Sequence, residues 1–150
     1  MSSPSLKPNP IPEGHRTVTP FLRVADAARL IDFMKQAFAA TEAFRMDGPD
    51  GSVAHAEVKI GDSLVMIGQA PADQAMQSML HLYVPDTDAV YKSALAAGAT
   101  SIREPADQFY GDRSAGVRDA QGNEWWMATH IEDVSQEEME RRMAAMGQAK

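Results

Sequence analysis

The alternation of apolar and polar residues predicts a first group of one strand, one helix and three strands. A β-rich run over residues 17–24 predicts the strand, and Asp26 is the expected N-cap of a helix that extends to about residue 38. Apolar side chains recur at helical spacing within this helix: Leu30, Phe33, Met34, Ala37 and Phe38. The three further strands are expected at residues 41–46, 52–60 and 63–68.

The same order of elements is predicted again after a linker over residues 69–78. A strand at 80–84 is followed by a helix, for which Asp86 and Asp88 are alternative N-caps and Gly98 is the expected C-terminal stop. A long loop over residues 104–113 separates the first two of the next three strands. These strands are expected at residues 99–103, 114–119 and 124–130.

An internal repeat with an offset of 60 residues supports this order. Phe21-Leu-Arg-Val24 followed by Asp26 aligns with His81-Leu-Tyr-Val84 followed by Asp86. Two copies of one supersecondary unit predict an α+β fold, in which two βαβββ modules form a cupped mixed sheet. We assign residues 1–16 as a tail and residues 17–134 as a single domain, whose two modules are residues 17–69 and 79–134. Residues 135–150 are expected to form a short charged C-terminal helix that begins with a capping box.

The composition is that of one globular domain without cysteine chemistry. The chain has 150 residues, of which 44% are hydrophobic, and this is enough for a single core. The absence of cysteine excludes disulfides, thiol catalysis and thiolate metal sites, and it fits a cytoplasmic protein. The net charge of −7 argues against sequence-independent nucleic acid binding, and no apolar run is long enough to span a membrane. Neither nucleic acid nor a membrane is an expected partner.

Four segments make the chain resemble the vicinal-oxygen-chelate superfamily of glyoxalases, bleomycin-resistance proteins and dioxygenases. Two of them resemble its first strand and helix and its closing turn: Phe21-Leu-Arg-Val-Ala-Asp26 with Ile31-Asp-Phe33, and Asp119-Ala-Gln-Gly-Asn-Glu-Trp125. Two others resemble the uncharacterised, PhnB-like, glyoxalase-related branch: His55-Ala-Glu-Val-Lys-Ile-Gly-Asp62 and Gln108-Phe-Tyr-Gly-Asp-Arg-Ser114. The resemblance covers about residues 17–134. It implies a cup that holds a small-molecule ligand and is often completed in a homodimer.

The resemblance also implies where a divalent metal would bind, because one residue from each of four strands holds it in this superfamily. The corresponding residues here are Thr19, Met66, Met79 and Trp126. None of them is a usual ligand for such a metal, so we expect neither a metal nor another cofactor. Metal-dependent glyoxalase or ring-cleaving dioxygenase chemistry is therefore disfavoured. The cup itself is still expected.

Strand alternation places titratable side chains on the face that these positions share. His81, His55 and Glu57 are the candidate catalytic residues, because each is expected to face the cup and could move a proton. Structural hydrogen bonding is the alternative role for both histidines. An ion pair with Lys59 or Arg23 is the alternative role for Glu57.

Other side chains on the same face are the candidate ligand-binding residues: Arg23, Met66, Met79, Tyr83 and Trp126. In related enzymes an arginine holds a ligand carboxylate near the position of Arg23. The apolar members would suit a flat or apolar ligand, or alternatively would fill a collapsed cup. Trp126 is expected to offer a stacking wall, whereas Trp125 is expected to pack under the helix with Met127.

The loop from Gln108 to Arg113 adds two ligand-binding candidates. Tyr110 could form an aromatic wall, and Arg113 could clamp a carboxylate or phosphate in bidentate geometry. The alternative for Arg113 is an internal ion pair with Asp112.

Three classes of function remain after these considerations. The first is binding and sequestration of a small molecule in a metal-free cup. The second is a metal-independent lyase or isomerase that uses His and Glu for acid–base chemistry on a carbonyl compound. The third is an interaction or structural protein, for which the charged terminal helix is the only indication. Fold alone does not choose among these classes, so the sequence leaves open whether the protein is an enzyme.

Overall fold

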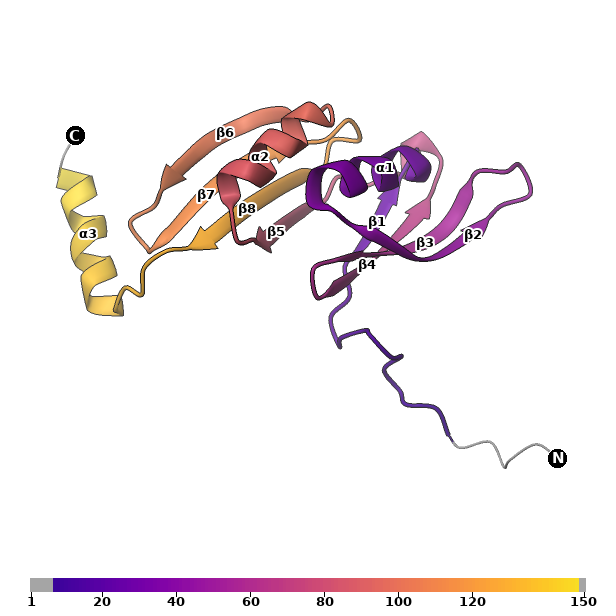
Figure 1. The fold of residues 1–150 in the computed structure, drawn as a ribbon, viewed down its shortest axis with the longest axis horizontal. Coiled ribbons are helices and arrows are strands. Elements are labelled where there is room, and N and C mark those ends of the chain that lie inside the picture. Colours follow the sequence, from indigo (N-terminus) through magenta and orange to yellow (C-terminus); the bar gives the residue numbers. More distant parts are fainter. Residues whose placement is uncertain (1–6, 149–150) are drawn as a thin grey trace.

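A computed structural model describes residues 7–148, which form two four-stranded sheets side by side (Figure 1). The remaining residues of the predicted tail and terminal helix, 1–6 and 149–150, lie outside the described residues. The first module comprises β1 (Phe21–Val24), α1 (Ala27–Phe38), β2 (Thr41–Asp47), β3 (Val53–Ile60) and β4 (Ser63–Gln69). The second module and the terminal helix comprise β5 (Met79–Tyr83), α2 (Thr87–Ala96), β6 (Thr100–Asp107), β7 (Asp112–Arg118), β8 (Glu124–His130) and α3 (Gln136–Gln148). The predicted α+β fold of two βαβββ modules is confirmed.

The two sheets have the same topology. Their strand orders are β1-β4-β3-β2 and β5-β8-β7-β6. In each sheet the first strand is parallel to the last strand of its module, and the other neighbours are antiparallel. Within residues 7–148 the two sheets are hydrogen-bonded separately rather than as one continuous sheet.

The helix N-caps repeat between the modules as the sequence indicates. The side chains of Asp26 and Asp86 each accept a hydrogen bond of 3.1 Å from the backbone N–H three residues later. Asp86, rather than Asp88, is therefore the cap of α2. Each cap satisfies one of the backbone N–H groups that a helix leaves unpaired at its start. None of the helices within residues 7–148 is long and apolar enough to cross a membrane.

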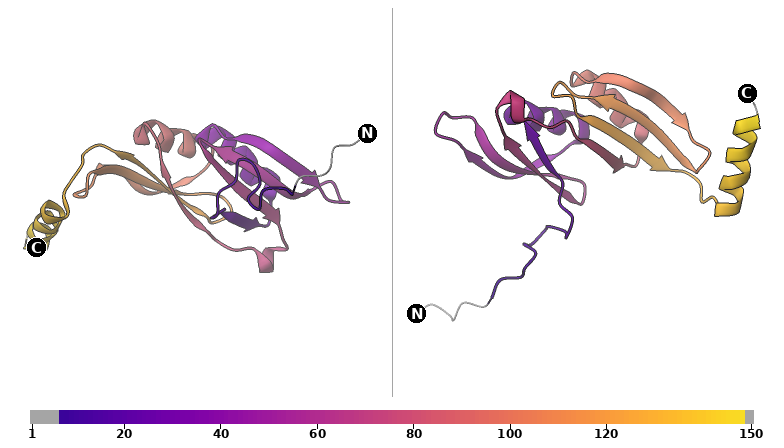
Figure 2. Two further views of the ribbon diagram at one scale, coloured as in Figure 1. Left: turned by 90° about the horizontal axis from the view of Figure 1, so that it is seen from below. Right: turned by 180° about the vertical axis from the view of Figure 1, so that it is seen from behind.

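The main core lies between the sheets and the two helices α1 and α2, which pack against each other on the same side of the molecule (Figures 1 and 2). Trp125 of β8 is fully buried there, and its ring centroid lies 6.4 Å from Phe33 and 4.9 Å from Phe38 of α1. Its Nε1 donates to Asp119 at 2.7 Å. Trp125 thus packs under a helix as predicted, and it connects the second sheet to the helix of the first module.

Two predicted boundaries were wrong, and proline explains both. The first strand begins only at Phe21, directly after Pro20. The expected loop 104–113 is mostly strand, because β6 continues to Asp107 and only a short turn leads to β7. β6 is an edge strand with two register shifts, and an edge strand with bulges tolerates a proline such as Pro105.

Candidate functional site

The side of the second sheet that faces away from the helices carries most of the polar and aromatic candidates. We call it the second open face, and it is formed by alternate residues of four strands: Met79, His81, Tyr83, Arg103, Asp112, Ser114, Gly116, Glu124, Trp126 and Ala128. Cross-strand pairing places His81, Trp126 and Gly116 in one row, with Arg103 at its end.

Trp126 lies flat on this face. Strand alternation predicts the face, but not the orientation of the ring. A Cβ added to Gly116 would lie 2.6 Å from the indole ring, so the ring rests directly on the glycine backbone. The indole Nε1 donates a hydrogen bond of 3.0 Å to Glu124, and Arg118 donates to the other carboxylate oxygen at 3.2 Å. The missing Cβ and the hydrogen bond together hold the ring in one orientation.

Tyr83 places a second aromatic ring on the same face. Its hydroxyl donates to Asp112 at 2.8 Å, although Tyr83 is on β5 and Asp112 is on β7. The tyrosine ring must therefore pass across β8, where Ala128 is fully buried. His81 stands next to it, with a distance of 5.0 Å between the two ring centroids.

Asp112 is the buried centre of a polar network that the sequence analysis missed. Asp112 is 4% exposed and, besides the Tyr83 hydroxyl, its carboxylate contacts Nδ1 of His130 at 2.8 Å. The other nitrogen of His130 lies 2.7 Å from Asp133. The network joins three strands and the segment after β8, and it could not be inferred from spacing because its members are far apart in sequence.

The network also changes the protonation of its members. Burial by itself raises the pKa of Asp112, but hydrogen bonds from His130 and Tyr83 outweigh it and hold the pKa below its usual value. The hydrogen bonds to Asp112 and then to Asp133 raise the pKa of His130, and the bond to Asp112 raises the pKa of Tyr83. At neutral pH the Tyr83 hydroxyl is therefore protonated and donates a hydrogen bond to the Asp112 carboxylate.

The first open face, on the corresponding side of the first sheet, holds the other candidates. It is formed by Phe21, Arg23, Phe44, Met46, His55, Glu57, Leu64 and Met66. The ring of His55 lies 5.9 Å from that of Phe21 and 6.3 Å from that of Phe44. The predicted candidates His55 and His81 therefore lie on different sheets, and one chain does not bring them together in one cluster.

The segment before β1 covers part of the first open face. The side chain of His15 is only 11% exposed and lies in close contact with Glu57, without hydrogen-bond geometry. A Cβ added at the neighbouring Gly14 would lie 3.3 Å from Leu64. The residue in close contact with the Glu57 carboxylate is therefore His15, and not Lys59 or Arg23.

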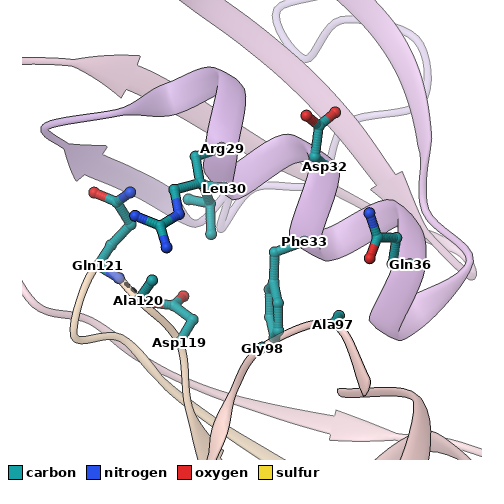
Figure 3. Close-up of a pocket in the computed structure, with 10 residues that line it drawn as sticks. All are labelled: Arg29, Leu30, Asp32, Phe33, Gln36, Ala97, Gly98, Asp119, Ala120 and Gln121. Carbon is teal, nitrogen blue, oxygen red and sulfur yellow. Dashed lines mark hydrogen bonds between the residues drawn. The ribbon is translucent and has the colours of Figure 1, made fainter. Parts of the chain in front are cut away.

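A groove and a smaller pocket lie outside the two open faces. The groove, of about 440 Å³, runs between β5 and the β3–β4 turn, and His81 and Tyr83 line it together with Phe38 and Val90. The pocket, of about 160 Å³, lies on the helix side between α1, the end of α2 and the β7–β8 turn (Figure 3). The groove borders the second open face, because His81 and Tyr83 belong to both.

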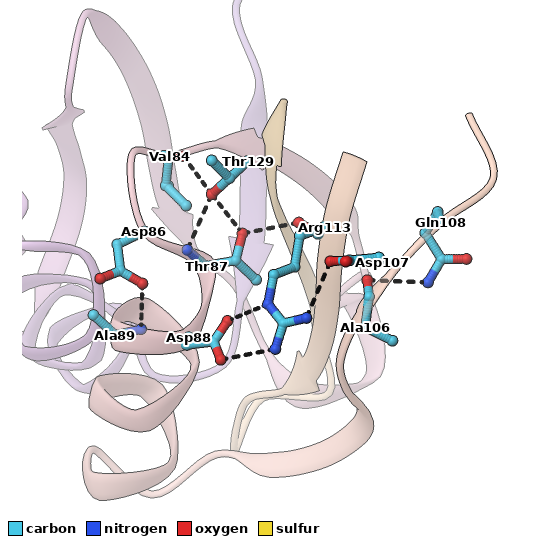
Figure 4. Close-up of polar contacts among 10 residues, drawn as sticks. All are labelled: Val84, Asp86, Thr87, Asp88, Ala89, Ala106, Asp107, Gln108, Arg113 and Thr129. Atoms are coloured by element: carbon cyan, nitrogen blue, oxygen red, sulfur yellow. Dashed lines mark hydrogen bonds and ion pairs between the residues drawn. The ribbon is translucent and has the colours of Figure 1, made fainter. Parts of the chain in front are cut away.

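Arg113 does not face the predicted cup. Its guanidinium forms a bidentate ion pair with Asp88 of α2 at 2.7 and 2.9 Å, and it also contacts Asp107 at 3.1 Å (Figure 4). The Thr87 hydroxyl donates to the backbone carbonyl of Arg113 at 3.0 Å. Because alternation in β7 turns Arg113 toward α2, it fastens the start of that helix to the sheet. Its ion-pair partners are Asp88 and Asp107, so the alternative pair with Asp112 was wrong, and the role of Arg113 as a ligand clamp stays a prediction.

Tyr110 lies in the short turn between β6 and β7, with its ring 5.2 Å from that of Phe109. The turn is held against the segment after β8, since the backbone N–H groups of Ile131 and Glu132 both donate to the carbonyl of Gly111. Arg142 of α3 donates to the carbonyl of Phe109 at 3.0 Å. Tyr110 thus lies at the end of the second sheet, in a turn that is held by hydrogen bonds to the segment after β8 and to α3.

Arg103 is the remaining residue that sequence reasoning missed. Its guanidinium lies 4.9 Å from the centroid of the Trp126 ring, and Nη2 donates to the Ser114 hydroxyl at 2.7 Å. Simple alternation gave no signal for it, because the register shifts on either side of Arg103 decide which way it points.

Comparison with known proteins agrees with this architecture. Residues 15–127 match the Glyoxalase/Bleomycin resistance protein/Dioxygenase superfamily. The chain belongs to this superfamily. An uncharacterised protein of Mycobacterium bovis is 36% identical over 142 residues, which cover 87% of this chain and 93% of the relative. An uncharacterised protein of Mycobacterium tuberculosis is equally similar, with 87% and 84% covered.

Solved structures of the superfamily share the fold. TioX from Micromonospora sp. ML1 has a TM-score of 0.64 at 23% identity, covering 76% of this chain and 99% of its own. A PhnB protein from Bacillus cereus, described as a putative 3-demethylubiquinone-9 3-methyltransferase, has a TM-score of 0.63 at 15% identity, with 76% and 99% covered. At these identities the likeness establishes the fold alone.

The superfamily's four metal positions do not fit a divalent metal in this chain. The Thr19 hydroxyl donates to the carbonyl of Arg16 at 3.0 Å, and the Trp126 indole N–H is used by Glu124. Met66 and Met79 offer only thioethers, which are poor ligands for hard or borderline metals. In the part of the chain that the structure describes, no three His, Asp or Glu side chains are grouped to hold a metal ion.

Proposed function

We propose that this protein binds and sequesters a flat, largely apolar small molecule on the second open face. The observation that supports this most strongly is that two aromatic side chains of one sheet face, Trp126 and Tyr83, are held in place by hydrogen bonds to Glu124 and Asp112. Rings that are fixed before binding lose little side-chain entropy when a planar ligand stacks on them. Binding needs no metal at such a surface.

The surroundings of the two rings support a ligand rather than a packed core. Met79 is 66% exposed and Tyr83 is 67% exposed, although both are large hydrophobic side chains. Exposed apolar side chains next to a few oriented polar groups are typical of binding sites. The groove beside β5 continues this surface toward the first module.

The proposal is tested with a planar probe and a saturated probe of the same size. A thermal-shift screen, with divalent metals and with chelator, first identifies planar compounds that stabilise the protein. Naphthalene-2-carboxamide is expected to bind about three- to tenfold more tightly than its decahydro analogue, because only the planar ring can stack. Trp126→Leu should remove this difference, and Phe44→Leu on the first open face should preserve it. Equal affinity for both probes in the wild type would contradict the proposal.

Acid–base catalysis is a second candidate, favoured by the position of His81. This exposed imidazole stands beside the Tyr83 hydroxyl, which Asp112 fixes. His81 could remove a proton from the carbon next to a ligand carbonyl and return it to a neighbouring atom. Deuterium exchange at that carbon of the bound ligand would be abolished by His81→Ala and preserved by His55→Ala. Exchange that persists without His81 would exclude His81 as the base, and exchange no faster in the wild type than in free ligand would leave binding as the function.

We also propose that the protein is a cytoplasmic homodimer. Both open faces lack helix cover within residues 7–148, and Phe21, Phe44 and Met46 are about half exposed on the first one. A second copy placed across the two-fold axis would enclose the ligand surface. Sedimentation at micromolar concentration should give twice the chain mass of 16.3 kDa, whereas a pure 16.3 kDa species would overturn the dimer.

A further inference from the structure

Arg103 is a cation on the second open face that is held in position before any ligand is present. We propose that Arg103 binds a carboxylate group of the ligand, so that the protein selects planar aromatic acids over neutral planar compounds. The proposal rests on the proposed function of this face and specifies its ligand class.

Two contacts orient the guanidinium. Its Cζ lies over the Trp126 ring, 4.9 Å from the centroid, and Nη2 donates to Ser114, a residue that is only 2% exposed. The indole beneath it is fixed in turn by Glu124 and by the backbone of Gly116. The guanidinium of Arg103 is therefore ordered at the Trp126 end of the aromatic surface, where it can meet a substituent of a bound ligand.

Among the described residues, the remaining donors of Arg103 have no carboxylate partner. A guanidinium has five N–H groups, and Ser114 accepts from Nη2 alone. Within residues 7–148, Arg113, Arg118 and Arg142 each form an ion pair, but no carboxylate lies within ion-pair distance of Arg103. A planar guanidinium with free donors matches the two oxygens of a carboxylate, which makes this anion the fitting ligand group.

Arg29 is the competing cation and therefore provides the matched control. It also lacks a carboxylate partner within the described residues, but it lines the small helix-side pocket beside Asp32 and Asp119 (Figure 3). Two acidic side chains and a volume of about 160 Å³ make that pocket unfavourable for an aromatic acid. Neutralising either arginine changes the net charge by the same amount, so the pair separates a local contact from a general charge effect.

The experiment measures the ratio of two affinities by titration calorimetry at pH 7. Naphthalene-2-carboxylate and naphthalene-2-carboxamide present the same ring with and without a negative charge. The wild type should bind the carboxylate about tenfold more tightly, as expected for a charge-assisted hydrogen bond at an accessible site. The ratio should fall to about one in Arg103→Gln, remain about ten in Arg29→Gln, and be intermediate in Arg103→Lys, which keeps the charge but loses the planar fork.

The other outcomes overturn the proposal in distinguishable ways. An affinity ratio that stays near ten in Arg103→Gln shows that another group binds the carboxylate. An affinity ratio that falls to one in Arg29→Gln shows that the acid binds in the helix-side pocket. A wild-type ratio near one, with both probes bound and dependent on Trp126, rejects the role of Arg103 but leaves the stacking function standing. Failure of the wild type to bind either probe at millimolar concentration rejects both proposals.

Discussion

The two open faces are built on the same topology but differ in how their aromatic side chains are held. On the second face the rings of Trp126 and Tyr83 each donate a hydrogen bond to a carboxylate. On the first face Phe21 and Phe44 are 49% and 47% exposed, and their neighbour is the ring of His55. A phenyl ring has no polar atom through which the sheet could fix it.

This difference shows how a duplicated scaffold can separate two tasks. An anchored ring has already lost its rotamer freedom in the folded protein, so a ligand does not have to order it. An unanchored ring adapts to whatever covers it, and the first face is already partly covered by the segment that contains His15. In our proposal the second face therefore recognises a small ligand, and the first face packs against protein.

The largest expected effect separates the two adjacent tryptophans of β8. Trp125→Ala should lower the free energy of unfolding by roughly 3–5 kcal/mol, because a fully buried ring is replaced by a cavity. Trp126→Ala should cost much less, since that ring lies on the open face and not in the core. Urea denaturation followed by circular dichroism measures both values. Equal losses for the two variants would show that Trp126 belongs to the core and that the second face is not an open site.

A smaller effect is expected at the glycine beneath each face. Gly116→Ala should lower stability by about 1–3 kcal/mol and displace the Trp126 indole, because the new methyl group meets a ring that cannot move freely. Gly68→Ala should cost less, although its Cβ would lie 2.8 Å from Phe21, because that exposed phenyl ring can swing aside. Denaturation and a shift of the tryptophan emission maximum report the two changes. A costlier substitution at Gly68 would reverse the proposed difference in anchoring.

The helix caps should behave alike in the two modules. Asp26→Ala and Asp86→Ala should each lower the free energy of unfolding by about 1 kcal/mol, because each removes the acceptor of one helix N–H group. The matched Asp→Asn variants keep a side-chain acceptor and should recover most of this loss. If only one of the alanine variants is destabilising, the modules do not contribute equally to the cooperative unit.

The smallest effect is a dependence of stability on pH that belongs to the second module. Because the pKa of His130 is raised in the folded protein, its contribution is complete below about pH 6.5 and is lost as the pH rises through the folded value. Asp112, whose pKa is lowered, loses its contribution only as the pH falls through its own folded value. Stability should therefore decline as the pH rises above about 6.5, and His130→Gln should flatten that decline. His81→Gln is the control, and an unchanged slope in His130→Gln would exclude the network as its origin.

The elements and their faces could be predicted from local sequence because they depend on neighbours along the chain. The cap Asp26, the strand at 124–130 and the opposite orientations of Trp125 and Trp126 follow from residue spacing, whereas spacing left Asp86 and Asp88 as alternative caps of the second helix. The 60-residue repeat indicated the two modules. Such features need no knowledge of which strands become neighbours.

The contacts that define the second face depend on pairing between strands, which spacing does not encode. β8 lies between β5 and β7, and only that order brings Tyr83 within reach of Asp112. Two register shifts in β6 turn Arg103 toward Trp126, and alternation in β7 turns Arg113 toward Asp88 instead. The sequence could identify the residues capable of binding a ligand. The tertiary structure decided which of them meet, because one shifted register sends a side chain to the opposite face of its sheet.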